Sequence, residues 1–149
     1  MATLETHTFD ATRVLQTAGL VASSAAGTNI EDLGPGVGVR YGKVVIDVTA
    51  LEIASNDEAY TITVTGSSDA AFGTAGNVVE LASLTLGAKE IKLSDSDRDD
   101  AVGRRELLFK NTDEDGTPLR YIRLYITVAG SVATGINFSA RYVPLKNMS

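Results

Sequence analysis

The sequence lacks cysteine and tryptophan altogether and contains a single histidine, His7. Without cysteine, a disulfide framework, a thiolate metal site and a thiol nucleophile are all excluded. His7 stands between two threonines in a segment that we expect to be mobile, which argues against Ser-His-Asp catalysis and multi-histidine zinc sites. Carboxylates are the main catalytic groups left, and most lie in expected loops, where raised pKa values are not expected. We therefore expect no enzyme and no cofactor.

Long apolar runs and an excess of positive charge are also missing. Runs such as Val44-Val45-Ile46 are far shorter than the roughly 20 residues that span a bilayer. The first residues do not show the basic and then apolar pattern of a signal peptide. Thirteen Lys and Arg against nineteen Asp and Glu give a net charge of -6, the wrong sign for binding a phosphate backbone. We expect neither a membrane nor a nucleic-acid partner.

What the sequence does contain is hydrophobic alternation with a period of two, which is typical of half-buried strands. In the segment 60–65, Tyr60, Ile62 and Val64 fall on one face and three threonines on the other. With 149 residues, of which 44% are apolar, the chain is large enough for one domain with a core. The pattern predicts roughly six to eight short strands, within 43–53, 60–65, 78–86, 90–93, 107–110, 119–128 and 136–142. We therefore expect an all-β fold, an antiparallel β-sandwich of jelly-roll type.

The first 36 residues differ in composition from the rest. They are rich in small residues between 22 and 28 and end at the glycine-rich segment 34–38, which we interpret as a hinge. The segment 10–21 could form a short helix capped by Asp10 or could be extended. We expect an extended N-terminal arm over 1–36 and a sandwich domain over 37–149, so that deleting the arm should leave a folded sandwich.

The segment 111–118 is a cluster of turn-forming residues between two expected strands. It joins 107–110 to 119–128, and both flanking segments have the composition of strands. We therefore expect these two strands to form a hairpin.

Two acidic loops partly match a calcium-binding loop. Asp95, Asp97 and Asp99 fall at its positions 1, 3 and 5, but Asp100 stands where the loop needs glycine. The second loop begins at Asn111 and has Ile122 where the final acidic ligand should be. Acidic loops are usually solvated connections. We assign no metal ligand, although a weak cation site stays open.

Tyr121, Arg123 and Tyr125 share one face of the strand expected over 119–128, opposite its aliphatic face. Tyrosine and arginine are enriched in protein–protein interfaces. Three interpretations remain open: an interface or arm contact, ordinary packing under the other sheet, and a ligand site such as a sugar platform. These three residues are the candidate interface.

Four segments together resemble a known family. They are 28–34 (TNIEDLG), 60–72 (YTITVTGSSDAAF), 120–124 (RYIRL) and 138–143 (FSARYV). In order and spacing the chain resembles the jelly-roll capsid cement, or decoration, proteins of tailed bacteriophages, particularly those on short-tailed phage heads. The resemblance implies a non-enzymatic virion protein, made in the host bacterial cytoplasm and located on the outer capsid surface.

Further expectations follow from the same resemblance. It implies a homo-oligomer, with a homodimer as the expected form, whose partner is the major capsid protein. Such a protein bridges capsid subunits and stabilises the mature head. Two alternatives stay open: a carbohydrate- or cation-binding β-sandwich module of adhesin type, and another minor virion structural protein.

Overall fold

The computed structural model describes residues 13–73, 77–88 and 99–145. Within these ranges the chain forms β-strands and no helix, so no described segment is a candidate for a helical membrane span. The strands are β1 (Val14–Gln16), β2 (Leu20–Val21), β3 (Ala25–Asp32), β4 (Tyr41–Leu51), β5 (Ala59–Ser67), β6 (Val78–Gly87), β7 (Gly103–Lys110), β8 (Tyr121–Ala129) and β9 (Ile136–Leu145).

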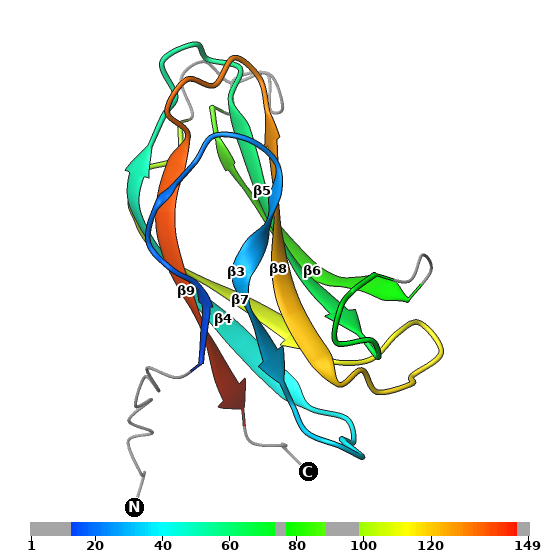
Figure 1. The fold of residues 1–149 in the computed structure, drawn as a ribbon. Coiled ribbons are helices and arrows are strands. Elements are labelled where there is room, and N and C mark those ends of the chain that lie inside the picture. Colours follow the sequence, from blue (N-terminus) through cyan, green and yellow to red (C-terminus); the bar gives the residue numbers. More distant parts are fainter. Residues whose placement is uncertain (1–12, 74–76, 89–98, 146–149) are drawn as a thin grey trace, which may run out of the picture.

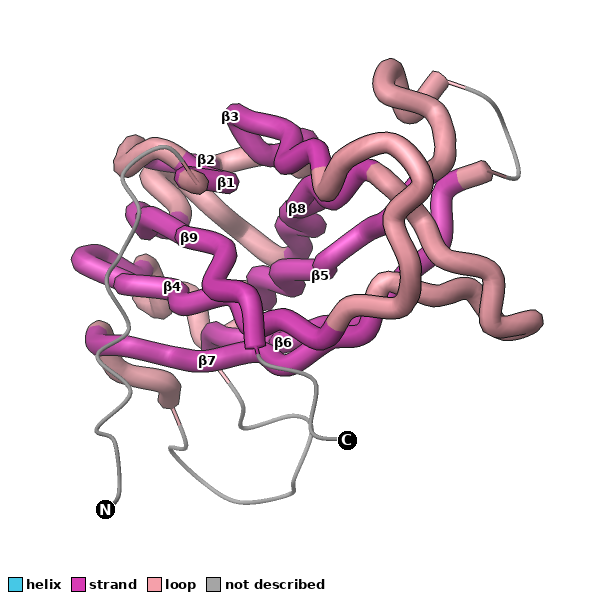
Figure 2. Tube along the Cα trace, turned by 90° about the horizontal axis from the view of Figure 1, so that it is seen from below, coloured by secondary structure: helices cyan, strands magenta, loops and turns pink. Residues whose placement is uncertain are grey.

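The strands form two antiparallel sheets that face each other (Figures 1 and 2). The first sheet has the order β1-β9-β4-β7, and β2 also pairs with β9. The second sheet has the order β3-β8-β5-β6. The expected all-β architecture with antiparallel sheets is therefore confirmed.

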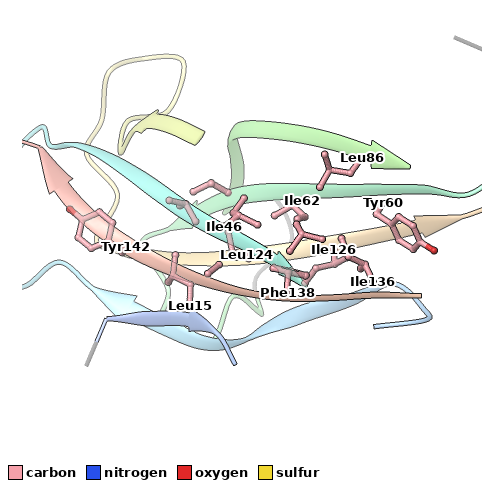
Figure 3. Packing of buried hydrophobic residues seen from close by; sticks show 14 of the residues in the cluster. Leu15, Ile46, Tyr60, Ile62, Leu86, Leu124, Ile126, Ile136, Phe138 and Tyr142 are labelled. Atoms are coloured by element: carbon pink, nitrogen blue, oxygen red, sulfur yellow. The ribbon is translucent and has the colours of Figure 1, made fainter. Parts of the chain in front are cut away.

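The core lies between the sheets and is built from alternate residues of the central strands (Figure 3). Tyr60, Ile62 and Val64 of β5 are fully buried, as the alternation predicts. Thr63 and Thr65, on the opposite face of β5, are also buried. Because β5 is an inner strand with β8 on one side and β6 on the other, neighbouring side chains cover its outer face as well.

The expected hairpin between 107–110 and 119–128 is wrong. β7 and β8, which contain these segments, belong to different sheets, and the intervening loop carries the chain from one sheet to the other. Buried Asn111 holds this loop: its Nδ2 donates to the carbonyl oxygens of Gly38 and Leu119, each at 3.1 Å, and its Oδ1 accepts from the backbone of Arg40 at 2.6 Å. The turn-forming residues thus identify a turn but not the pairing partner of either strand.

Residues 13–33 differ from the expected arm, because they are strands of the sandwich. β1 pairs with β9 and β3 pairs with β8, so this segment supplies an edge to each sheet. Leu15 of β1 points into the core beside Leu124 and Phe138 (Figure 3). Residues 1–12 lie outside the described residues, as do the expected strand 90–93 and His7.

Side-chain hydrogen bonds also tie β1 to β3. Gln16 Oε1 accepts from the backbone N–H of Thr28 at 3.0 Å, and Thr28 Oγ1 accepts from the backbone N–H of Thr17 at 2.8 Å. These bonds cross from one sheet to the other and join the two sheets at the edges formed by β1 and β3. Deleting residues 1–36 would therefore remove strands from both sheets, and we no longer expect a folded sandwich from that deletion.

A pair of leucine substitutions tests whether this segment is structural. Leu15 is 0% exposed and Leu20 is 61% exposed, so the same change to alanine removes a core side chain in one case and a surface side chain in the other. We expect Leu15→Ala to lower the free energy of unfolding by about 2–5 kcal/mol. Leu20→Ala should change it by no more than about 0.5 kcal/mol. Urea denaturation measures both, and equal small effects would mean that the segment is peripheral.

Candidate functional site

The outer face of the β3-β8-β5-β6 sheet contains the residues that the sequence singles out. Ile122, Leu124 and Ile126 of β8 are fully buried toward the core. Tyr121, Arg123 and Tyr125 alternate with them on the outer face, where Tyr121 and Arg123 are half-buried and Tyr125 is 39% exposed. The predicted stripe therefore exists, and it does not lie under the other sheet.

Two apolar residues that sequence reasoning missed extend the stripe. Ile30 of β3 is the cross-strand partner of Arg123 and is 43% exposed. Phe72, which follows β5 and is itself buried, stacks on Arg123, whose Cζ lies 4.3 Å from the centre of the ring. We call Ile30, Phe72, Tyr121, Arg123 and Tyr125 the β8 face.

A tight turn after β5 places Phe72 on this face. The carboxylate of Asp69 accepts from the backbone N–H groups of Ala71 at 3.0 Å and Gly73 at 3.2 Å. The Phe72 N–H donates to the Asp69 carbonyl oxygen at 3.1 Å, and Phe72 has a positive φ of 52°. A positive φ is uncommon for a bulky residue and is associated with functional sites. The sequence signal that could have located this turn is the aspartate at 69, since short polar side chains cap turns in this way.

Arg123 is the polar centre of the β8 face. Its Nε is shielded from solvent and has no hydrogen-bond partner among the described residues. Its backbone carbonyl accepts from Thr65 Oγ1 at 2.7 Å, which fixes the strand beneath it. A guanidinium held between aromatic and aliphatic side chains is suited to a carbonyl or carboxylate acceptor on another protein.

An ion pair closes one end of the β8 face. Arg120 donates through Nε to Asp32 Oδ1 at 2.7 Å and through Nη2 to Oδ2 at 2.9 Å. The same guanidinium lies 5.0 Å from the ring centre of Tyr121. The hydrogen bond from Arg120, together with that from the Gly34 N–H, lowers the pKa of Asp32 from 3.8 to about 2. The pair thus joins β3 to the start of β8 beside the stripe.

Carboxylates elsewhere on the described chain hold loops together. Glu52 has a lowered pKa, mainly because it accepts from the backbone N–H of Gly135, and Asp57 has a lowered pKa, mainly because it accepts from the backbone N–H of Ser131. A carboxyl that acts as a general acid needs its pKa raised. These two groups are shifted in the opposite direction and are engaged in structural hydrogen bonds.

The acidic loops contribute no cluster of metal ligands to the part of the chain that the structure describes. Asp95 and Asp97 lie outside the described residues. In the second loop, Asn111 is turned inward, and Asp113 Oδ1 accepts from the backbone N–H groups of Asp115 and Thr117 at 3.0 and 2.8 Å. Asn111 and Asp113 therefore stabilise the turn between the sheets.

Comparison of the chain with protein-family models and with characterised protein sequences gave no match.

The Asp32–Arg120 pair predicts a specific acid sensitivity. Because the folded-state pKa of Asp32 is lowered, its contribution to stability is present above the ordinary pKa of 3.8 and is lost as the pH falls toward about 2. We expect Asp32→Asn to reduce the loss of stability across this pH window, and Arg120→Ala to do the same, since each removes one side of the pair. Urea denaturation at a series of pH values measures this slope. An unchanged slope in both variants would contradict the assigned pair.

Proposed function

We propose that this chain is a bacteriophage capsid cement protein, a non-enzymatic virion component that binds the outside of the head. In this proposal it bridges subunits of the major capsid protein as a homo-oligomer and stabilises the mature shell. The β8 face is the surface that contacts the capsid protein.

The observation that carries the proposal is the composition and exposure of the β8 face. Tyr125 and Ile30 are exposed at its surface, beside the half-buried Arg123 stacked on Phe72. Tyrosine and arginine are enriched among the residues that dominate binding energy at interfaces, and a rigid aromatic side chain loses little entropy on binding. The face is thus suited to a protein partner.

The nesting of the strand pairs supports a jelly-roll fold. β1 and β2 both pair with β9, so they count as one interrupted strand. The next strand from each end of the chain, β3 and β8, pair in the other sheet. β4 then pairs with β7 in the first sheet and β5 with β6 in the second. This nested pairing of eight strands in two sheets supports the jelly-roll interpretation, an architecture found in viral capsid domains and also in lectins.

Charge and multivalency agree with a position on the outside of a capsid. A net charge of -6 is compatible with an exterior site, because packaged DNA would repel an acidic protein inside the shell. A shell presents many copies of each binding site, so an oligomer gains avidity from modest individual contacts. A protein that binds the intact shell better than the ruptured one shifts the equilibrium toward the intact state.

Two matched tyrosine variants test the proposed surface. Tyr125 on the β8 face is 39% exposed, and Tyr41 on the outer face of the first sheet is 45% exposed. We expect Tyr125→Asp to weaken binding to mature empty shells of the phage that encodes this chain by roughly tenfold or more, as loss of an interface anchor does. Tyr41→Asp should bind like the unmodified protein. Co-sedimentation with the shells measures both.

Circular dichroism and thermal melting show whether the variants are folded. If folded Tyr125→Asp binds as strongly as the unmodified protein, the β8 face is not the capsid-binding surface. If the unmodified protein binds a panel of glycans and not the shells, the chain is an adhesin-type module and the proposal fails.

A further inference from the structure

β7 is an edge strand with a regular register. It pairs with β4 from Tyr41↔Lys110 to Val48↔Gly103 without any shift, and none of the other strands in the described ranges pairs with its second edge. Proteins usually protect such an edge with a bulge, a proline, charged side chains or a covering segment. The charged side chains of β7 lie toward its two ends and leave Leu107, Leu108 and Phe109 as an apolar centre. The described part of β7 has neither a bulge nor a proline.

Two hydrogen bonds establish which backbone groups of β7 point outward. The Asn111 N–H donates to the carbonyl oxygen of Arg40, which precedes β4, so Asn111 faces that strand. The carbonyl oxygen of Arg104 instead accepts from the Arg105 guanidinium. Since successive residues of a strand point their backbone groups to opposite sides, Glu106, Leu108 and Lys110 direct theirs away from β4.

Arg105 covers only the first part of this edge. Its guanidinium donates to the carbonyl oxygens of Arg104 at 3.2 Å and Ala101 at 2.8 Å. These two acceptors precede Glu106, so the contacts of Arg105 lie before the part of the edge from Glu106 to Lys110. At its centre Leu108 is 67% exposed, the highest exposure among the large apolar residues of the described chain. An exposed leucine in the middle of a regular edge strand marks a site for strand pairing.

We propose that two copies of this chain pair through β7, antiparallel and centred on Leu108, so that their first sheets join into one continuous sheet. In this register Leu108 lies opposite the partner's Leu108. On the same face Glu106 lies opposite the partner's Lys110, and by symmetry the second Glu–Lys pair forms as well. On the inner face Leu107 lies opposite the partner's Phe109, which extends the apolar core across the interface.

Neighbouring registers lack this complementarity. A register centred on Arg105 places two guanidinium groups opposite each other. It also breaks the hydrogen bond from the Arg105 guanidinium to the carbonyl oxygen of Arg104. Centring on Glu106 places two carboxylates opposite each other, and centring on Leu107 places Arg104 opposite the partner's Lys110. Like charges directly opposite are destabilising. Centring on Phe109 places Leu108 opposite the partner's Lys110 and forms no Glu–Lys pair. Among these registers only the one centred on Leu108 therefore pairs Glu106 with Lys110 twice and avoids like charges.

The inference deepens the proposed function and rests on it for its biological purpose. The β8 face belongs to the other sheet, so pairing through β7 leaves both copies of that face available for capsid subunits. One dimer would then have two capsid-binding surfaces, which is what a bridging protein needs. The test of the dimer uses the purified protein alone. A monomeric protein could still bind the capsid, and a dimeric protein could fail to bind it, so the two proposals are tested separately.

Charge-reversal variants test the register by sedimentation equilibrium. Glu106→Lys alone places two lysines opposite each other at both pairs, and Lys110→Glu alone places two glutamates there. We expect each variant to raise the dimer dissociation constant by roughly tenfold or more. An equimolar mixture should recover heterodimers, since each lysine then meets a glutamate. The mixture also controls for loss of the Lys43–Glu106 pair within one chain, 3.1 Å in the unmodified protein, which mixing cannot restore.

A single-cysteine variant tests the centre of the interface. The chain contains no cysteine, so Leu108→Cys introduces one defined thiol. Opposite residues in a hydrogen-bonded antiparallel pair have Cα atoms about 5.5 Å apart, within the range of a disulfide. We expect rapid oxidation to a covalent dimer, and slow oxidation of Thr127→Cys, an exposed position on the outer face of the other sheet.

Several outcomes would overturn the inference. They are a monomer at every concentration tested, a dimer that the charge reversals leave unchanged, a mixture that forms no heterodimer, and equal cross-linking at positions 108 and 127. Thermal melting checks that each variant is folded, which we expect because the substituted side chains are exposed.

Discussion

The antiparallel pairing of the last strand with both the β1/β2 segment and β4 is the constraint on which the rest of the structure depends. β9 lies between these partners, so the two ends of the described chain meet in one sheet. The next pair, β3 with β8, then forms in the opposite sheet. Alternate side chains of both sheets meet between them, and Leu15 from the first strand completes the core. Because residues 13–33 supply an edge to each sheet, they are part of the domain that carries the β8 face.

This arrangement also determines which side chains are available for partners. β8 is an inner strand of its sheet, so its aliphatic residues are committed to the core and its tyrosines and Arg123 are left on the outer face. The turn after β5 adds Phe72, and β3 adds Ile30. β7 is an edge strand of the other sheet, where Leu108 is exposed between two opposite charges. The fold thus separates a surface that we propose for the capsid from an edge that we propose for a second copy.

The sequence predicted the strands whose side chains alternate strongly. The segments 43–53, 60–65, 78–86 and 136–142 correspond to β4, β5, β6 and β9 within a few residues, because β-branched and aromatic residues there alternate with polar ones. β1 to β3 were not predicted as strands of the sandwich, since residues such as Ala25, Ala26 and Gly27 have little β-propensity of their own. Their pairing comes from β8 and β9, about a hundred positions further along the chain, which local patterning does not reveal.

Only part of the candidate site was predictable, because local patterning does not reveal contacts between distant segments. Period-two alternation predicted that Tyr121, Arg123 and Tyr125 share an outer face, because that depends only on their own strand. Phe72 and Ile30 join that face through a turn and a long-range strand pair, which the alternation of β8 does not encode. The turn at 111–118 was recognised, but turn chemistry does not specify whether the next strand pairs back or crosses to the other sheet.

We propose that this chain stabilises a mature phage shell from outside. The most direct measurement is the temperature at which empty mature shells rupture, recorded with increasing amounts of the folded protein and together with the number of copies bound per capsid subunit. We expect saturable binding, near one copy for each capsid subunit, and a rupture temperature that rises as the sites fill. Binding of a few copies per shell, or no binding and no change in rupture temperature, would contradict it.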